Sequence, residues 1–234
     1  ESVIKEMKNL KEKYWQGTKY DYSASANISN KESLKIEDNT LVYFVDDVFT
    51  VNKKRVKKLL RMMIDQKLGM RWKCEARADH LDDEICKLMA EAGCERVKIG
   101  FESGSDKILK QIQKLETREE MLEGANMLKK AGVPFSAYFM VGFPGETDDD
   151  VKKTIDFAKQ VEADYYSLSV LAPYYGTELY DQLIKNGHAL DKQPWEYFFH
   201  QSPKPMVNDK ISTKVLQEYL NLSELNKKAK GRRG

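Results

Sequence analysis

The chain alternates short apolar runs with segments of helical periodicity. Residues 41–45 form a β-branched and aromatic run typical of a strand buried on both faces. After the N-cap-type residue Asn52, apolar side chains recur at helical spacing up to position 64. The same alternation recurs four times, which predicts strands at 71–77, 95–101, 135–141 and 166–171 with helices at 82–92, 118–131, 148–161 and 178–186, and a short helix at 106–111. Because each connection contains a helix, the strands should be parallel.

The two ends of the chain differ from this central pattern. Residues 3–14 predict a helix that ends near Gly17, and the polar, Ser- and Asn-rich stretch 18–40 predicts a long loop. An aromatic segment at 195–199 and a helix near 213–225 follow the last strand–helix pair. We therefore expect a core domain at 1–187 and a C-terminal extension at 188–234. Periodicity alone leaves a doubly wound sheet and a barrel open, but both place ligands at the carboxyl ends of the strands.

Composition and charge narrow the class of protein. With 41% hydrophobic and 32% charged residues among 234, the balance is that of a globular chain rather than a disordered or membrane one. The net charge of +2 gives no general electrostatic reason for nucleic-acid binding, and the basic stretch 227–233 reads as a solvated tail. The apolar run 135–143 is too short to span a membrane, and the N-terminal stretch lacks the apolar core of a secretory signal. We expect a cytoplasmic protein.

The cysteines offer no metal site by their spacing. Cys74, Cys86 and Cys94 are odd in number, which argues against a disulfide framework and for a reducing compartment. Their spacing matches no metal-binding motif. We therefore interpret all three as buried structural side chains, with Cys74 facing the helices.

The segments that follow the predicted strands are rich in Gly, carboxylates and hydroxyls. Glycine allows close approach of backbone to a ligand, and carboxylates accept hydrogen bonds from ammonium or ribose groups. Each segment also has a structural interpretation, since Asp46 could cap a helix and Arg77 could pair with Asp79 or Glu75. The five segments are DDVF at 46–49, RAD at 77–79, GFESGS at 100–105, GFPGET at 142–147 and PYYGT at 173–177.

Taken in order, the motifs VYFVDDVFTVN, GFESGSDKILKQIQK, GFPGETDDD and LAPYYGTELY resemble the core of radical S-adenosylmethionine (SAM) enzymes. The resemblance covers most of residues 41–187. It is strongest to the cobalamin-dependent branch, which includes anaerobic Mg-protoporphyrin IX monomethyl ester cyclases and many methyltransferases. It implies an α/β fold, a partial (β/α)6 TIM-like barrel of parallel strands with outer helices, to which this chain supplies the second to sixth strands and lacks the first.

The resemblance also assigns cofactor contacts to the strand ends. Asp46 and Asp47 match positions that face the methionine amino group, and Glu102 matches one that contacts the ribose or amino-acid end. Val141 and Gly142 match the segment whose backbone lines the adenine. The full set implied is Asp46, Asp47, Arg77, Glu102, Ser103, Val141, Gly142 and Pro173.

Two of these assignments depart from a simple match. Arg77 corresponds only to a place near the methionyl carboxylate or the substrate. Pro173 closes the sixth strand beside the adenine, but Tyr175 stands where the more usual PYPGT pattern has a second proline.

Family chemistry requires a 4Fe–4S cluster, usually held by a CxxxCxxC motif after the first strand, and this sequence contains no such motif. The resemblance implies that the chain begins beyond that loop. The parent enzyme would generate a 5′-deoxyadenosyl radical anaerobically, with a reductant protein such as flavodoxin or ferredoxin, a small-molecule substrate and possible cobalamin on an upstream domain. We expect neither catalytic nor metal-ligating residues here, and an inactive fragment.

Two other interpretations stay open at this point. A degenerate barrel without the cluster motif would serve as a binding or scaffold module. An ordinary doubly wound nucleotide-binding enzyme would need a glycine-rich first loop, and neither G-x-G-x-x-G nor a Walker sequence is present.

Overall fold

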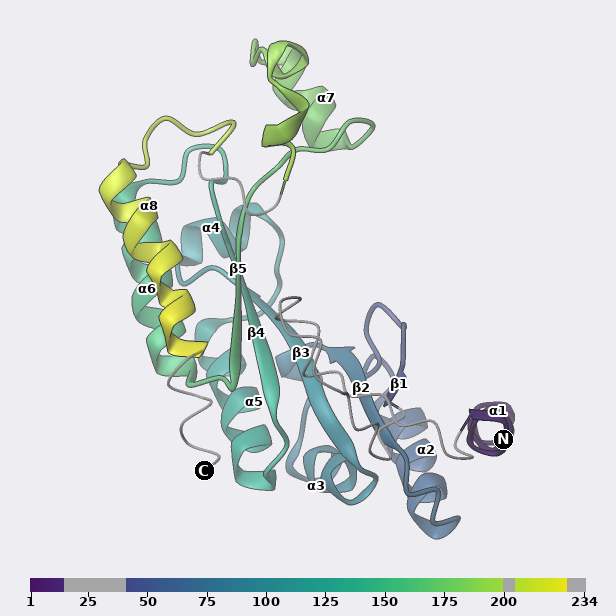
Figure 1. Ribbon diagram of the computed structural model, residues 1–234. Coiled ribbons are helices and arrows are strands. Elements are labelled where there is room, and N and C mark those ends of the chain that lie inside the picture. Colours follow the sequence, from purple (N-terminus) through teal and green to yellow (C-terminus); the bar gives the residue numbers. More distant parts are fainter. Residues whose placement is uncertain (15–40, 200–204, 227–234) are drawn as a thin grey trace, which may run out of the picture. The chain divides into compact units, whose positions relative to one another are not determined.

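The computed structural model describes residues 1–14, 41–199 and 205–226 (Figure 1). The expected loop 18–40 and the basic tail 227–233 lie outside the described residues. Contacts divide the chain into two compact units, which we describe separately. Unit 1 comprises residues 1–98 and 126–134, and unit 2 comprises residues 99–125 and 135–234.

Five strands form one sheet in the order β1-β2-β3-β4-β5, so that neighbours in the sheet are neighbours in sequence. Register is parallel for the pair β1–β2 and for the pair β4–β5. A doubly wound sheet reverses its strand order at a switch point, whereas a barrel adds each strand beside the previous one. The observed order is therefore that of the barrel alternative. The strands are β1 (Leu41–Tyr43), β2 (Arg71–Ala76), β3 (Cys94–Glu102), β4 (Phe135–Val141) and β5 (Tyr165–Val170).

Unit 1 packs its helices on one face of β2. Trp72, Cys74 and Ala76 alternate along the strand and are all buried, and the Trp72 indole N–H donates to the Ala92 carbonyl at 2.8 Å. The side chains of Lys73 and Glu75 therefore lie on the opposite face. The helices of this unit are α1 (Ser2–Tyr14), α2 (Lys53–Asp65), the short 3₁₀ helix η2 (Ala78–His80) and α3 (Asp83–Glu91).

Local signals explain where the helices of unit 1 begin. The Asn52 side chain accepts from the Arg55 N–H at 2.9 Å, as the N-cap prediction required. In the same way Asp82 accepts from the Ile85 N–H at 2.8 Å and starts α3.

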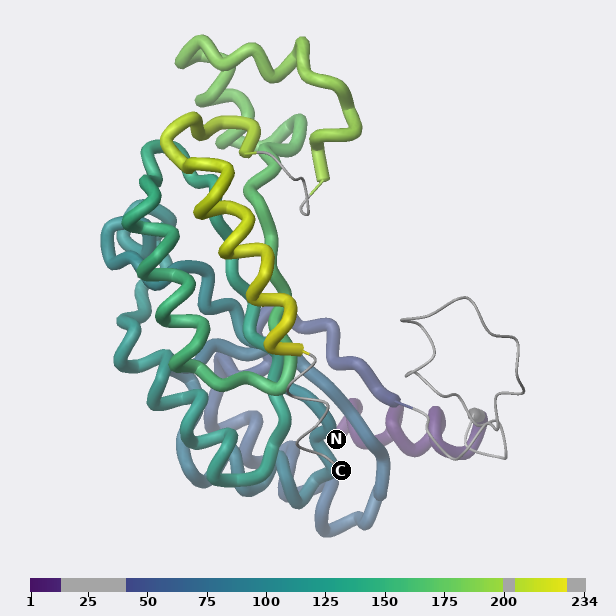
Figure 2. Tube along the Cα trace, turned by 60° about the vertical axis from the view of Figure 1, so that its left-hand side comes forward, coloured from purple at the N-terminus to yellow at the C-terminus, as the bar shows by residue number. Residues whose placement is uncertain are grey.

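Unit 2 has an aromatic core beneath β4. The rings of Phe101 and Phe139 stack with centroids 5.6 Å apart, and Phe157 of α6 meets Phe139 edge-on at 6.1 Å. Helix α8 lies beside α6 (Figure 2), and its buried Tyr219 hydroxyl donates to the Phe139 carbonyl at 2.8 Å. The helices are α4 (Asp106–Gln111), α5 (Arg118–Ala131, which continues into unit 1), α6 (Asp148–Val161), α7 (Glu178–Lys185), η3 (Leu190–Lys192), η4 (Trp195–Tyr197), α8 (Thr213–Leu220) and η5 (Asn221–Glu224).

Among the described residues, none of the helices combines the length and apolar character needed to cross a membrane.

Candidate functional site

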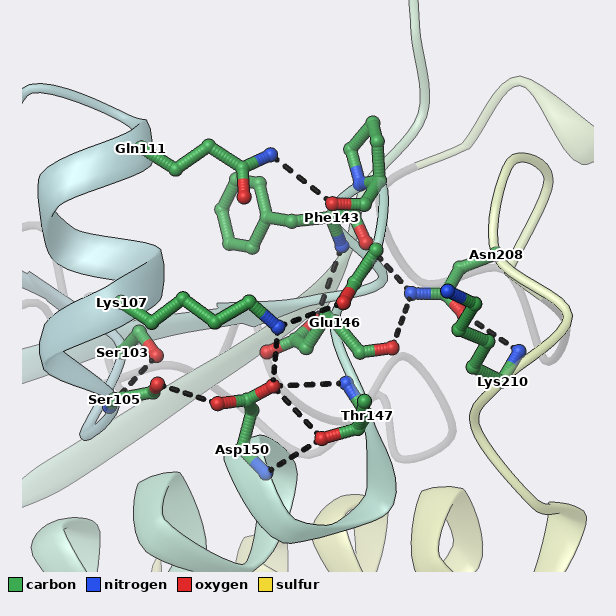
Figure 3. A network of polar contacts seen from close by, with 12 residues as sticks. Ser103, Ser105, Lys107, Gln111, Phe143, Glu146, Thr147, Asp150, Asn208 and Lys210 are labelled. Carbon is green, nitrogen blue, oxygen red and sulfur yellow. Dashed lines mark hydrogen bonds and ion pairs between the residues drawn. The ribbon is translucent and has the colours of Figure 1, made fainter.

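The turn after β4 is held by a buried carboxylate. Glu146 is fully buried, and its Oε2 accepts from the Gly142 N–H at 2.6 Å. The same oxygen accepts from the Phe143 N–H at 3.0 Å (Figure 3). Asn208 fixes the other side of the turn by donating to the carbonyls of Phe143 at 2.6 Å and Glu146 at 2.8 Å. Gly142 has φ of +97°, which a side chain would strain. The backbone that follows β4 is therefore held in one shape.

Burial also changes the acidity of Glu146. It raises the pKa of this carboxyl to about 7, against the lowering effect of the two backbone hydrogen bonds. The second oxygen, Oε1, is buried and has no hydrogen-bond partner among the described residues. At neutral pH the group is consequently divided between its protonated and ionised forms.

Asp150 has the opposite behaviour although it lies in the same network. Burial disfavours its charge, but hydrogen bonds from Ser105 (2.6 Å), Lys107 (2.9 Å) and the Thr147 hydroxyl (2.8 Å) hold its pKa well below the usual range. Lys107 also donates to the Gly145 carbonyl at 2.8 Å. Asp150 thus joins the segment after β3 to the turn after β4 through an ionised carboxylate (Figure 3).

The GFESGS segment packs directly on α6. The Ser103 and Thr154 hydroxyls are 3.0 Å apart, and the Gly104 N–H donates to Thr154 Oγ1 at 3.0 Å. A Cβ on Gly104 would press on the Lys153 carbonyl and lie 2.7 Å from Phe157 Cβ. The glycine is therefore needed for close approach, and the Ser103 hydroxyl is engaged in this packing contact.

Glu102 ends β3 in the left-handed region of backbone space, with φ of +62°, which is uncommon for a residue with a side chain. Its carboxylate lies over Gly100, where any Cβ would collide with it. Burial raises its pKa, the Lys114 ammonium lowers it, and the Glu116 carboxylate raises it further. Lys114 lies 3.0 Å from the fully buried Glu116 carboxylate. This set, which we call the Glu102 triad (Glu102, Lys114 and Glu116), offers carboxylate oxygens to hydroxyl or ammonium donors.

The ends of β4 and β5 lie together in unit 2. Val141 pairs with Val170 in the parallel register, and the Val141 carbonyl accepts from the Leu171 N–H at 2.8 Å. A Cβ on Gly142 would lie 3.4 Å from the Leu171 nitrogen. Buried Pro173 follows two residues later. The structure thus places Val141 and Gly142 beside the strand end that leads to Pro173. Their contact with the adenine stays a prediction.

The predicted residues of unit 1 have surface or local partners. Asp46 and Asp47 are exposed, and Asp46 lies 3.8 Å from the half-exposed Arg55. Arg77 forms two contacts of 3.0 Å with the Asp79 carboxylate, so the ion pair considered from the sequence is confirmed. Ligand binding by these residues stays a prediction.

The three cysteines do not fit an iron–sulfur cluster. All are free and buried. A hydrogen bond with Cys94, together with burial, raises the pKa of Cys74 well above its usual value, and burial raises that of Cys86 to about 12. Cluster ligands are thiolates, which these environments disfavour. Within the described ranges, no group of three or more His, Cys, Asp or Glu side chains could hold a metal ion. The burial that we expected for the three cysteines is confirmed.

Sequence reasoning missed several residues that shape this site. Asp150 was recoverable, because Thr147 and Asp150 form a capping box whose spacing is visible in the sequence. Glu146 was part of a motif that we noted, yet its burial is a tertiary property. Lys114 and Asn208 carried no local signal, since each acts on a group from another segment.

An open pocket of about 420 Å³ lies elsewhere in unit 2. It involves none of the predicted site residues. Its lining comes from α7 and the loop that follows: Tyr180, Ile184, Gly187, His188, Ala189, Asp191 and Lys192.

Comparison with protein families identifies the class. The model of the radical SAM superfamily matches residues 14–158, more than half of the chain. The chain therefore belongs to the radical SAM superfamily, whose members are enzymes that use S-adenosylmethionine and a 4Fe–4S cluster.

Two individual relatives show which kinds of radical SAM enzyme this chain is similar to. The chain is 32% identical over 184 residues to an uncharacterized methyltransferase of Pyrococcus horikoshii, covering 77% of this chain and 40% of the relative. It is 20% identical over 212 residues to the anaerobic magnesium-protoporphyrin IX monomethyl ester cyclase of Rubrivivax gelatinosus, covering 88% of this chain and 38% of the relative. The predicted resemblance is confirmed. The chain spans about 40% of the length of these relatives.

A solved structure shares the fold. The radical SAM methyltransferase TsrM from Kitasatospora setae, with cobalamin and a 4Fe–4S cluster bound, superposes with a TM-score of 0.51 at 20% identity over 56% of this chain and 27% of that chain. With the sequential order of five strands, this confirms the α/β class and the partial TIM-like barrel.

Proposed function

We propose that this chain is the SAM-binding core of a radical SAM methyltransferase, with cyclisation as the other reaction that the relatives suggest. The observation that carries the proposal is the Glu102 triad. A carboxylate in strained backbone at the carboxyl end of a barrel strand, with a raised pKa and an ammonium nearby, is typical of a ligand site rather than of a packing contact.

Each residue would act on a particular part of SAM. Glu102 would accept hydrogen bonds from the ribose hydroxyls or the amino group, and Lys114 would keep that carboxylate ionised. The backbone of Val141 and Gly142, with Pro173, would line the adenine, and Glu146 and Asn208 would hold the turn that presents it. Asp46, Asp47, Arg77 and Ser103 are proposed as further contacts on the resemblance alone.

The radical-forming machinery lies outside the described residues. When bound, a reduced 4Fe–4S cluster supplies the electron that cleaves SAM, but the buried cysteines here do not fit as its ligands. We therefore expect this chain alone to be inactive. The cobalamin bound to TsrM supports cobalamin as a further cofactor of the whole protein. A flavodoxin or ferredoxin would supply electrons, and three free cysteines support a cytoplasmic location.

Calorimetric titration of the chain with SAM tests this function. We expect saturable binding that Glu102→Ala weakens about tenfold, the effect of losing about 1.4 kcal/mol of polar contact. Glu123→Ala, which removes an exposed carboxylate from α5, is the matched control and should bind as the unaltered chain does. Equal affinities for the unaltered chain and Glu102→Ala would remove Glu102 from the site.

A non-catalytic barrel is the second candidate, and the buried cysteines agree with it as well as with the enzyme. Anaerobic reconstitution of the chain with iron and sulfide, followed by iron counting, decides whether these cysteines hold a cluster. We expect no stable four-iron cluster. The coding sequence upstream of Glu1 separates the two candidates: a CxxxCxxC motif there supports the enzyme, and an intact upstream sequence without it supports the scaffold.

A further inference from the structure

The open pocket of unit 2 that contains none of the assigned residues has the size of a small-molecule site. Its volume of about 420 Å³ lies within the range of about 300–1,000 Å³ that such sites occupy. It is lined by Tyr180 and Ile184 of α7 and by five residues of the loop 187–192, and we call it the α7 pocket. An aromatic ring, an aliphatic side chain and several polar groups thus meet in one hollow.

The wall of the α7 pocket is held by the hydrophobic core of unit 2. Tyr180 is only 8% exposed, and it belongs to one buried cluster with Leu183 and Leu190. The same cluster contains Phe143, whose N–H donates to Glu146 in the turn after β4. The α7 pocket therefore shares its core with the turn that follows β4, and its aromatic wall is fixed before any ligand arrives.

Aromatic rings gather around Tyr180. The Tyr175 ring meets it edge-on with centroids 5.4 Å apart, and the Phe198 ring lies 6.5 Å from it at a tilt of 43°. Of the six aromatic side chains that are exposed in the described part of the chain, five lie between positions 174 and 199. Such a concentration is typical of a binding surface, and edge-on or tilted contacts of this kind allow a further ring to join.

The polar groups of the α7 pocket are available to a ligand. The Tyr180 hydroxyl has no hydrogen-bond partner among the described residues, although its ring is buried, and the same holds for the His188 imidazole. Asp191 and Lys192 supply one negative and one positive charge, and neither forms an ion pair within the described ranges. Since these charges cancel, the lining favours an uncharged ligand with a hydrogen-bonding group.

We propose that the α7 pocket binds a planar aromatic molecule that carries a hydrogen-bonding group. The ring of this molecule packs on Tyr180 and Ile184, and its polar group bonds to the Tyr180 hydroxyl. That the molecule is the substrate of the enzyme rests on the proposed function, and the shared core with Phe143 supports it, because that core also carries the turn assigned to the adenine. That the pocket binds such a molecule does not depend on the proposed function.

Fluorescence anisotropy with umbelliferone, a planar aromatic probe with one hydroxyl group, tests the α7 pocket without SAM or a cluster. We expect saturable binding to the unaltered chain. Coumarin, the same ring system without the hydroxyl, should displace umbelliferone but bind about fivefold more weakly, the effect of losing one hydrogen bond. Cyclohexanol has a hydroxyl but no aromatic ring, and at the same concentrations it should leave umbelliferone bound.

Three variants locate the binding on α7. Ile184→Glu places a charge on the apolar wall, and umbelliferone should bind it about tenfold more weakly. Gln182→Glu makes the same change of charge at an exposed position of α7 outside the pocket lining, and it should bind as the unaltered chain does. Tyr180→Phe keeps the buried ring and loses only the hydroxyl, so umbelliferone and coumarin should bind this variant equally.

Four results would overturn the proposal. They are an unaltered chain that shows no saturable binding of umbelliferone, displacement by cyclohexanol as effective as that by coumarin, unchanged affinity in Ile184→Glu with its circular dichroism intact, and a Tyr180→Phe variant that still prefers umbelliferone over coumarin fivefold. The Tyr180→Phe comparison remains decisive if Ile184→Glu fails to fold, because removing one hydroxyl leaves the packing of the ring unchanged.

The outcome is separate from that of the proposed function. A chain that binds umbelliferone in the α7 pocket but fails to bind SAM keeps the aromatic site and loses the proposed enzyme. A chain that binds SAM through Glu102 but does not bind umbelliferone keeps the enzyme and loses the aromatic site.

Discussion

Glu146→Gln should abolish a specific dependence of stability on pH. The wild-type carboxyl has a pKa of about 7 in the folded chain and an ordinary value of 4.5, so between these values the folded state keeps a proton that the unfolded state has lost. The free energy of unfolding must therefore fall as pH rises through this window. Glutamine cannot titrate, yet its side-chain oxygen can still accept from Gly142 and Phe143.

The magnitude follows from the shift. A rise of the Glu146 pKa from 4.5 to about 7 corresponds to about 3 kcal/mol in full, of which about 2–3 kcal/mol is expressed between pH 5 and pH 8. Glu146 is fully buried, so solvent does not screen this contribution. Asp150 does not interfere, because its lowered pKa removes stability only as pH falls below its ordinary value of 3.8.

Urea unfolding at pH 5 and pH 8, followed by far-ultraviolet circular dichroism, measures the effect. Glu146→Gln should gain about 2–3 kcal/mol relative to wild type on going from pH 5 to pH 8. Glu123→Gln, on the exposed surface of α5, controls for loss of one negative charge. A stability difference between wild type and Glu146→Gln that stays constant within about 0.5 kcal/mol over this range would refute the reasoning.

Three further variants or reagents test the packing. Gly104→Ala should lower the free energy of unfolding by about 1–3 kcal/mol, because its Cβ collides with α6; urea unfolding measures this. Tyr219→Phe should cost about 1–3 kcal/mol in the same assay, since its fully buried hydroxyl donates to the Phe139 carbonyl. The Cys86 thiol, with a pKa of about 12, should resist a disulfide reagent at pH 8 in the native chain and react within minutes in urea, as thiol counting would show; fast native labelling contradicts its burial.

Much of the fold followed from periodicity, because each strand is a short apolar run with a helix after it. The clearest difference is at β1, which was expected at 41–45 and ends at Tyr43. Beyond that residue Val45 is 79% exposed, and the chain turns to bury Phe49 against Trp72. The apolar run therefore overestimated the length of the strand. The Phe44 N–H still donates to the Lys73 carbonyl of β2 at 3.0 Å, but the Val45 side chain is exposed to solvent.

The site was harder to predict from the sequence than the fold, because a motif indicates where a residue lies along the chain but not which side chains it contacts. GFESGS and GFPGET indicated the correct strand ends. The GFESGS motif did not reveal that the Ser103 hydroxyl forms a hydrogen bond with Thr154. The RAD segment did not reveal that Arg77 forms its ion pair with Asp79 rather than with Glu75. Such choices depend on rotamers and on segments brought together by folding, and they decide whether a polar side chain remains available to a ligand.

Three carboxyl groups of unit 2 differ in how strongly their surroundings favour the ionised form, and no sequence motif specifies this difference. Asp150 has three side-chain donors and is kept ionised, so its role is that of a structural link. Glu146 accepts only two backbone hydrogen bonds, both on one oxygen, and burial raises its pKa to about 7. The pKa of Glu102 is also raised, because burial and Glu116 favour its neutral form and Lys114 opposes them. In the proposed function a SAM ribose or ammonium group would bind best to the ionised form of Glu102, so we expect the Lys114 charge to strengthen that contact.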